Sequence, residues 1–304
     1  MKEYLTAGSQ FSEYILEASE SAHFFLFVEG DDDRKLLSEH VAGHLVLRKI
    51  EGGKSTALEL AAVAARNQFS RMKVLVDQDF DFLDGSYPTS GVLLKSRTHD
   101  VFTDIATSNP AVLSKVVRSY VDTLRRRRVG PPADVDAIEP RVIRKALEIA
   151  RPVTMVRIAA QSLKLDVRFR GFNFREFAES ISMTVDAVVL QLQKNGAIPG
   201  GDQRVYSQLI ENAIEWDTRW DENALTVVGD HDMFSALSVS LSHEGIQSSR
   251  NGLHFDFINA TSCHHLRNVE WFTSIGAWSR LDGKPGFTCA TEGHCDIGVM
   301  AIAA

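Results

Sequence analysis

The stretches 24–33, FFLFVEGDDD, and 74–81, VLVDQDFD, decide the fold of this chain. Each is a short apolar run that ends abruptly in carboxylates, as buried parallel strands do where their carboxyl ends open onto a polar crevice. Two such strands side by side would bring Glu29, Asp77 and Asp79 to one sheet edge, where open α/β sheets bind ligands. Because crowded carboxylates repel one another, we expect a hard divalent cation, Mg²⁺ or Mn²⁺, between them.

Strand and helix patterns alternate at short intervals along the first third of the chain. The order is strand 23–28, helix 34–42, strand 45–50, helix 56–67, strand 73–76 and strand 92–94, preceded by an amphipathic helix over 4–19. Such alternation is typical of βαβ units with right-handed crossovers. The sequence therefore predicts an α/β fold with a Rossmann-like parallel sheet.

Helical patterns dominate after Asn109-Pro110. They cover 111–128, 142–149, 153–163 and 174–192, and another helix follows the loop at 199–202. The segment 224–228 is predicted to be a strand that rejoins the sheet, with a helix after it through Leu241. We expect an α/β domain that carries the carboxylates at 1–112, a basic helical region at 113–223 and a C-terminal segment at 224–304.

Composition indicates a soluble globular protein. The chain has 304 residues and 44% hydrophobic content, enough for a sizeable core. Neither a secretory signal pattern nor an apolar run of membrane-spanning length is present, so we expect a cytoplasmic protein with no membrane partner. Three cysteines argue against a disulfide framework and agree with a reducing compartment.

The strand motifs resemble those of the TOPRIM (topoisomerase–primase) fold. In that family a Glu after the first strand and a DxD pair after the third form a metal-dependent phosphodiester-chemistry site, and here they match Glu29, Asp77 and Asp79. The turn 50–56, IEGGKST, is similar to the Gly-Gly-Lys turn of the nuclease branch. Within it, the spacing resembles the DUF4435 and OLD-like proteins, including the effectors of PARIS phage defence.

This resemblance implies a metal-dependent endonuclease, a toxic effector in abortive phage defence that is kept inactive until an ATPase sensor partner releases it. Asp77 and Asp79 would hold Mg²⁺ or Mn²⁺, while Glu29 would ligate a metal or act as general base. Asp33 and Asp81 are the expected further ligands if a second ion is present. The substrate is RNA, including transfer RNA, or DNA, and the residues leave that choice open.

Lys54 admits two interpretations. Gly53-Lys54-Ser55 is similar to the end of a Walker A loop, but that motif needs a Gly at the position of Arg48. A strand-to-helix turn that brings Lys54 near a substrate phosphate fits better, and we count Lys54 among the catalytic candidates. An ordinary solvated lysine is the alternative.

His99 and Asp100 follow the fourth predicted strand, at the same sheet edge as the carboxylates. They are site candidates. Related nucleases place an acidic residue soon after such a His-Asp pair, whereas here Phe102 and Thr103 stand between the pair and Asp104. The alternative role for this pair is a helix cap.

Basic residues are concentrated in the middle of the chain, although the net charge is −7. From Lys115 to Arg175 there are fifteen Lys or Arg and six Asp or Glu, interleaved with Phe169, Phe172 and Phe174. This pattern favours nucleic-acid binding by charge and stacking, with an acidic protein partner or a solvated face as alternatives. The binding candidates are Arg125, Arg126, Arg127, Arg128, Arg168 and Arg170, supported by Arg141, Arg144, Lys145 and Arg175.

A group of cysteines and histidines lies near the C-terminus: Cys263, His264, His265, Cys289, His294 and Cys295. Thiolate and imidazole suit zinc, but no CxxC pair is present. The spacing favours buried thiols and surface histidines over a zinc site.

Two other functions compete with the nuclease. Asp77-Gln78-Asp79 also resembles the DxD nucleophile motif of haloacid-dehalogenase phosphatases, although that fold begins with its DxD strand. A non-catalytic adaptor that binds a partner ATPase is the second alternative. If the nuclease cuts both strands of a duplex it needs two sites, and we then expect a symmetric homodimer formed through the helical region.

Overall fold

The computed structural model describes residues 6–83, 91–127, 137–179, 183–198, 203–219, 224–280, 283–284 and 286–287. The chain divides into two compact units. The first, the sheet unit, comprises residues 1–78, 86–109 and 261–304; the second, the helical unit, comprises 79–85 and 110–260. The units change over at 109–110 and 260–261, whereas the sequence predicted boundaries at 112–113 and 223–224.

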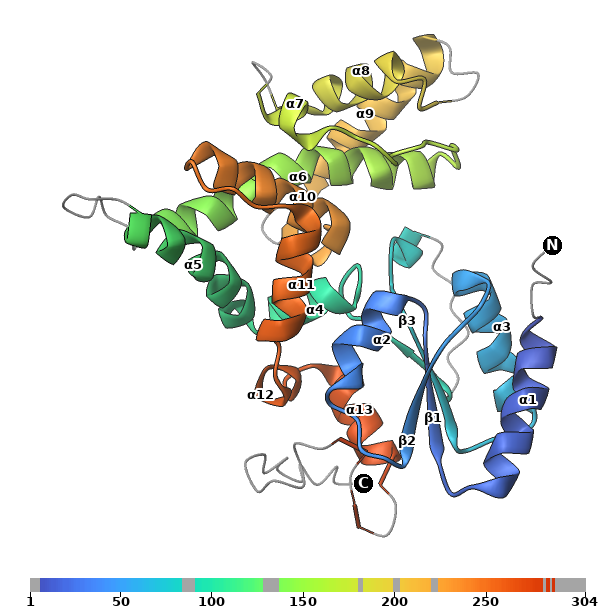
Figure 1. The fold of residues 1–304 in the computed structure, drawn as a ribbon. Helices are drawn as coiled ribbons and strands as arrows, with labels where there is room; N and C mark the ends of the chain where they lie inside the picture. The colour runs from blue at the N-terminus through green and yellow to red at the C-terminus, as the bar shows by residue number, and fades with distance from the viewer. Residues whose placement is uncertain are drawn as a thin grey trace. The chain divides into compact units, whose positions relative to one another are not determined.

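The sheet unit is built on four strands: β1 (Phe24–Val28), β2 (Leu45–Lys49), β3 (Met72–Val76) and β4 (Leu93–Lys95). All neighbouring pairs are parallel, and the order across the sheet is β2-β1-β3-β4 (Figure 1). The predicted α/β class, a Rossmann-like parallel sheet with added helices, is confirmed. The four strands occur where the sequence placed them, and every strand end lies within one residue of its predicted position.

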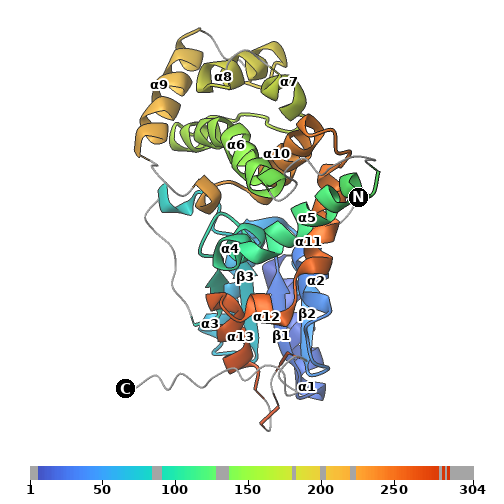
Figure 2. The same cartoon turned by 90° about the vertical axis from the view of Figure 1, so that its left-hand side faces the viewer.

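Helices cover both faces of this sheet, which explains why β1 is apolar at every position. Helices α1 (Ala7–Glu20) and α3 (Gly53–Arg66) pack on one face, in a core that includes Tyr14, Phe25 and Phe27. Helices α2 (Asp31–Ser38) and α13 (Glu270–Trp278) lie on the other (Figures 1 and 2). There the rings of Phe24 and Trp278 meet edge to face at 5.0 Å.

The C-terminal part of the chain returns to the sheet unit as helices. Helix α12 (Cys263–Leu266) packs against α4 (Val101–Ser108), and Phe287 forms an isolated bridge with Val41. The predicted strand at 224–228 is wrong: 224–226 is the 3₁₀ turn η3 (Ala224–Thr226), and α10 (Asp230–His243) follows it. The apolar run there is buried among helices, which periodicity alone does not distinguish from a buried strand.

The helical unit is organised around α6 (Ile138–Ser162), which packs against α9 (Gln203–Arg219) and α10. The other helices of this unit are α5 (Pro110–Arg127), α7 (Phe174–Ala178), α8 (Val185–Lys194) and α11 (Arg250–Ala260). The two helices predicted at 142–149 and 153–163 are one, which continues through Pro152 because its buried residues pack on both sides of that proline. The single helix predicted at 174–192 is two, since Thr184 caps α8.

Within the described ranges, no helix is both long enough and apolar enough to cross a bilayer.

Candidate functional site

Glu29 and Asp77 follow neighbouring strands of the sheet. Val28, the last residue of β1, pairs with Leu75 of β3, so both strands end at the same level. In the order β2-β1-β3-β4 the chain first adds a strand on one side of β1 and then crosses to the other side. Open α/β sheets bind ligands at such a reversal, outside the carboxyl ends of the two strands. The sheet therefore places both carboxylates at its expected ligand-binding edge.

The residues after β1 divide between this edge and the start of α2. Oε2 of Glu29 is buried. Asp33, which is 8% exposed, accepts a hydrogen bond at Oδ2 from Gly30 N at 2.8 Å and completes a capping box. Asp31 instead forms an ion pair with Lys49, whose hydrogen bond holds the pKa of Asp31 below its usual value. Asp33 thus has a capping function, and its predicted metal contact stays a prediction.

Asp77 is held by the N-terminus of α4. Val101 N donates a hydrogen bond to Asp77 Oδ1 at 3.1 Å. The N–H groups at a helix N-terminus stabilise negative charge, so this contact orients the carboxylate without neutralising it.

Lys54 lies beside the turn that follows Asp77. Its Nζ donates a hydrogen bond to Gln78 O at 3.3 Å. The turn before it uses left-handed backbone at Gly52 and Gly53, and a Cβ on Gly52 would lie 2.3 Å from Thr56 Oγ1. Only glycine fits there. The predicted strand-to-helix turn is confirmed, and it brings an ammonium group to the edge that carries Asp77.

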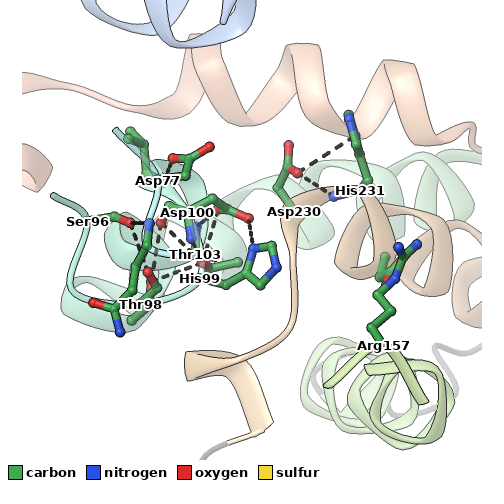
Figure 3. A network of polar contacts seen from close by, with 12 residues as sticks. Asp77, Ser96, Thr98, His99, Asp100, Thr103, Arg157, Asp230 and His231 are labelled. Atoms are coloured by element: carbon green, nitrogen blue, oxygen red, sulfur yellow. Dashed lines mark hydrogen bonds and ion pairs between the residues drawn. The ribbon is translucent and has the colours of Figure 1, made fainter. Parts of the chain in front are cut away.

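The loop after β4 is tied to the loop after β3 by a polar network (Figure 3). Ser96 Oγ accepts from Gln78 N at 2.9 Å and donates to Thr98 O at 2.8 Å. Asp100 caps α4, since its Oδ1 accepts from Thr103 N at 2.8 Å. Nδ1 of His99 lies 3.2 Å from Asp100 Oδ2. The helix-cap interpretation of Asp100 is confirmed, and His99 contacts the same carboxylate.

The Asp104 carboxylate holds this loop through a hydrogen bond from Arg97 N, a function that the sequence did not reveal. It is 2% exposed, and its Oδ2 accepts from Arg97 N at 2.8 Å and from Trp271 Nε1 at 3.1 Å. Burial raises the pKa of the Asp104 carboxyl above its usual value, although these two donors act in the opposite direction. Trp271 comes from α13, and no local pattern links it to this loop.

Asp79 and Asp81 belong to the helical unit. Asp79 has left-handed backbone (φ 48°), which aspartate tolerates better than most residues, and Asp81 begins the 3₁₀ turn η1 (Asp81–Leu83). This segment is attached to α9, because the ring of Phe82 packs against Trp216 at 6.1 Å. The DxD pair is therefore divided between the two units.

The donor chemistry suits a hard cation, but the described residues do not form a complete metal site. Carboxylate oxygens are the ligands that Mg²⁺ and Mn²⁺ prefer. Among these residues no three His, Cys, Asp or Glu side chains gather closely enough to hold an ion. Asp33 and Asp77 each use one oxygen to accept from a helix N-terminus. The predicted ligand set stays a prediction.

Part of the basic excess between Lys115 and Arg175 is paired within the helical unit, and the paired residues include Arg141, a predicted binding residue. Three arginines of α6 form hydrogen-bonded ion pairs with carboxylates much further along the chain: Arg141 with Glu244, Arg151 with Asp217 and Arg157 with Asp232. Arg168, Arg170 and Arg175 are exposed and form no ion pair with any described carboxylate. Arg128 and the side chains of Arg125, Arg126 and Arg127 lie outside the described residues.

The phenylalanines of this region are mostly core residues. Phe169 is 9% and Phe174 8% exposed, and Phe172 packs against Phe174 with ring centroids 5.1 Å apart. The Arg157 guanidinium lies over the Phe169 ring at 4.1 Å. The predicted stacking surface is therefore wrong for Phe169 and Phe174, because their rings are covered by this chain's own residues.

The C-terminal Cys/His group is only partly within the described residues. His264 is exposed as predicted, and His265 bonds to Ser262 through Nδ1. Cys263 is disulfide-bonded, so the predicted free thiol is wrong for this residue. Cys289, His294 and Cys295 lie outside the described ranges.

Fold and site together define a Rossmann-like α/β protein with acidic residues at the carboxyl edge of its sheet. No protein-family model matches the sequence, and no curated protein is significantly similar to it. Any activity must therefore be argued from the residues themselves.

Proposed function

We propose that this chain is a metal-dependent endonuclease of the TOPRIM type. The observation that carries the proposal is the position of Glu29 and Asp77 at the ends of β1 and β3, where the strand order reverses. The Lys54 ammonium beside the same edge supplies the positive charge that a phosphodiester requires.

Each residue then has a definable task. Glu29 would accept the proton of the attacking water, and Lys54 would hold a non-bridging phosphate oxygen. Asp77, oriented by Val101 N, would hold Mg²⁺ or Mn²⁺ together with Asp79, with Asp33 and Asp81 as further ligands. When bound, the cation would offset the charge that builds on the phosphate in the transition state.

The remaining parts of the proposal concern substrate, partner and location. Arg168 and Arg170 would bind the phosphates of RNA, including transfer RNA, or of DNA. An ATPase sensor partner and a function in abortive phage defence follow from the resemblance stated above. A homodimeric active form follows if both strands of a duplex are cut, because two sites are then needed. A cytoplasmic location is the expectation drawn from the composition. The disulfide at Cys263 is the observation against a reducing cytoplasm.

The test compares Glu29→Gln and Asp77→Asn with Glu59→Gln, a control on the exposed surface of α3. Plasmid DNA and total RNA are incubated with each protein in Mg²⁺, in Mn²⁺ and in EDTA. We expect metal-dependent cleavage that both site variants lower by on the order of 10²–10³-fold, because one loses the base for the attacking water and the other loses a ligand of the cation. The Glu59 variant should match the wild type.

A binding measurement separates the alternatives. Mn²⁺ at a hundred times its Kd should stabilise the wild type by about 2.7 kcal/mol and so raise its melting temperature, and it should not do so for Asp77→Asn, which lacks a proposed ligand. Undiminished cleavage by Glu29→Gln would contradict the proposal. Hydrolysis of a phosphomonoester without nucleic-acid cleavage would instead indicate the phosphatase, and metal-independent partner binding without hydrolysis would indicate the adaptor.

A further inference from the structure

The contact between His99 and Asp100 exceeds what a helix cap requires. The cap uses Asp100 Oδ1, which accepts from Thr103 N at 2.8 Å and from Thr103 Oγ1 at 3.0 Å. The other oxygen, Oδ2, lies 3.2 Å from His99 Nδ1, and the two side chains are only 16% and 6% exposed. A carboxylate at Nδ1 selects the tautomer with its proton on that nitrogen and stabilises the imidazolium. Nε2 is then the nitrogen at which the ring would exchange a proton with another molecule.

This pair is fixed next to Asp77. Val101 N donates to Asp77 Oδ1 at 3.1 Å and Thr103 N donates to Asp100 Oδ1, so the first turn of α4 holds both carboxylates (Figure 3). The loop that carries His99 is held further by Ser96 Oγ and by the buried Asp104 carboxylate. The imidazole is thus part of a rigid turn whose other end orients a proposed metal ligand.

We propose that His99 is a catalytic residue of this site, the general acid that protonates the leaving oxygen, with Asp100 as its positioning residue. The inference rests on the nuclease activity proposed above and adds the group that completes its proton balance. Glu29 would take the proton of the attacking water, and a second group must give a proton to the leaving oxygen.

The step balances as follows. The oxygen of water forms a bond to phosphorus, and the proton that this water loses passes to Glu29. The bond between phosphorus and the sugar oxygen breaks, and that oxygen takes the proton from His99 Nε2. The products are a phosphomonoester and a sugar hydroxyl, after which Glu29 releases its proton to solvent and His99 takes one up from solvent.

The experiment changes the need for a proton on the leaving atom. The wild-type cleavage site is mapped, and an oligonucleotide of that sequence is made with sulfur in place of the leaving oxygen. A thiolate leaves without protonation, so a variant that lacks only the general acid should recover on this substrate. We expect His99→Gln to lower kcat by about 10²–10⁴-fold on the oxygen substrate, with KM little changed, and by less than about threefold on the sulfur substrate.

Three further variants serve as controls. Asp100→Asn keeps a good N-cap and removes the charge beside Nδ1, so it should show a weaker form of the same pattern. His23→Gln removes a histidine that precedes β1, at the opposite end of that strand, and should match the wild type on both substrates. Glu29→Gln should lose both substrates alike, because its task is on the attacking side.

The outcomes distinguish the two proposals. If His99→Gln lowered kcat equally on both substrates, or on neither, the assignment of His99 would be overturned. The nuclease proposal would still stand in that case, provided that metal-dependent cleavage is lost in Glu29→Gln. A wild type that cuts neither substrate would overturn the nuclease and His99 together. Long-range ¹H–¹⁵N spectra give a readout without turnover: the His99 signals, absent in His99→Gln, should show a protonated Nδ1, and an Nε2-protonated neutral ring would overturn the pairing.

Discussion

Carboxylates are held in different ways at the proposed site of the sheet unit and in the helical unit. At the strand ends of the sheet unit, Asp33 and Asp77 accept hydrogen bonds from backbone N–H groups at helix N-termini. In the helical unit, a buried carboxylate such as Asp232 accepts two hydrogen bonds from one guanidinium, that of Arg157, at 2.6 and 3.0 Å. A backbone donor orients a carboxylate and leaves its charge, whereas a bidentate arginine neutralises it.

The difference shows which acidic and basic patterns can be interpreted locally. Acids after buried strands are brought to one edge by the sheet itself, so their neighbours in sequence predict their position. The basic excess of α6 meets its partners only through tertiary packing, because Glu244 lies 103 residues from Arg141 and Asp232 lies 75 residues from Arg157. A charge count along the chain therefore overestimates the basic surface of the helical unit.

The largest expected effect is the loss of stability when a core residue of one unit is truncated. It tests whether the two units unfold independently. Phe27 of β1 and Phe257 of α11 are both fully buried, the first against Tyr14 and the second against Phe234. Truncation of either to alanine should cost about 3–5 kcal/mol in its own unit. Hydrogen exchange should then rise across the unit that carries the substitution and remain near wild-type values in the other.

The control is Leu190→Ala, which removes a side chain that is 52% exposed and should change stability by less than about 0.5 kcal/mol. If Phe27→Ala raised exchange equally in both units, the chain would unfold as one cooperative body. The two units would then differ in how they hold their carboxylates but not in their stability.

The intermediate effect concerns two exposed arginines of the helical unit that form no ion pair with any described carboxylate. Replacing Arg168 and Arg170 with serine should weaken binding of RNA or DNA on the order of tenfold, about 1.4 kcal/mol. The slope of log affinity against log salt should fall by about two units, because two phosphate contacts are lost.

Arg66→Ser, an exposed arginine of α3 in the sheet unit, is the matched control and should leave the slope unchanged. An unchanged slope in the Arg168/Arg170 variant would instead support the acidic-partner or solvated-face interpretation of the helical unit. Fluorescence anisotropy over a salt series measures both quantities.

The smallest effect concerns Asp104, the buried acid behind the His99 loop. Because burial raises its folded pKa above the unfolded value near 3.8, the folded state retains a proton that the unfolded state releases between those two values. Stability from this group is thus full below about pH 3.8 and falls as pH rises through that window. Asp104→Asn keeps an acceptor for Arg97 N and Trp271 Nε1 and should flatten this dependence.

At neutral pH the gain should be on the order of 1 kcal/mol, the size of an ordinary single substitution. Asp186→Asn, at an exposed position of α8, is the control that should leave the pH dependence as in the wild type. A steeper fall of stability in Asp104→Asn, measured by denaturant unfolding between pH 4 and pH 7, would contradict the assignment.

The sequence by itself determined the parallel sheet, its four strands and the edge at which Glu29, Asp77 and Lys54 lie. These features follow from local patterns: an apolar run of strand length, the polar residues after it and the glycines that the turn at Gly52 requires. The order of strand and helix patterns then limits how such elements can connect, so the class of fold follows from the sequence.

Only the tertiary structure decided the partners of individual side chains and the choice between strand and helix in buried runs. Trp271 reaches Asp104 across 167 residues, and the run at 224–228 became a 3₁₀ turn in the helical unit. Both outcomes depend on contacts between segments distant in sequence. Their free energy arises only when those segments pack, so no window of local sequence contains it.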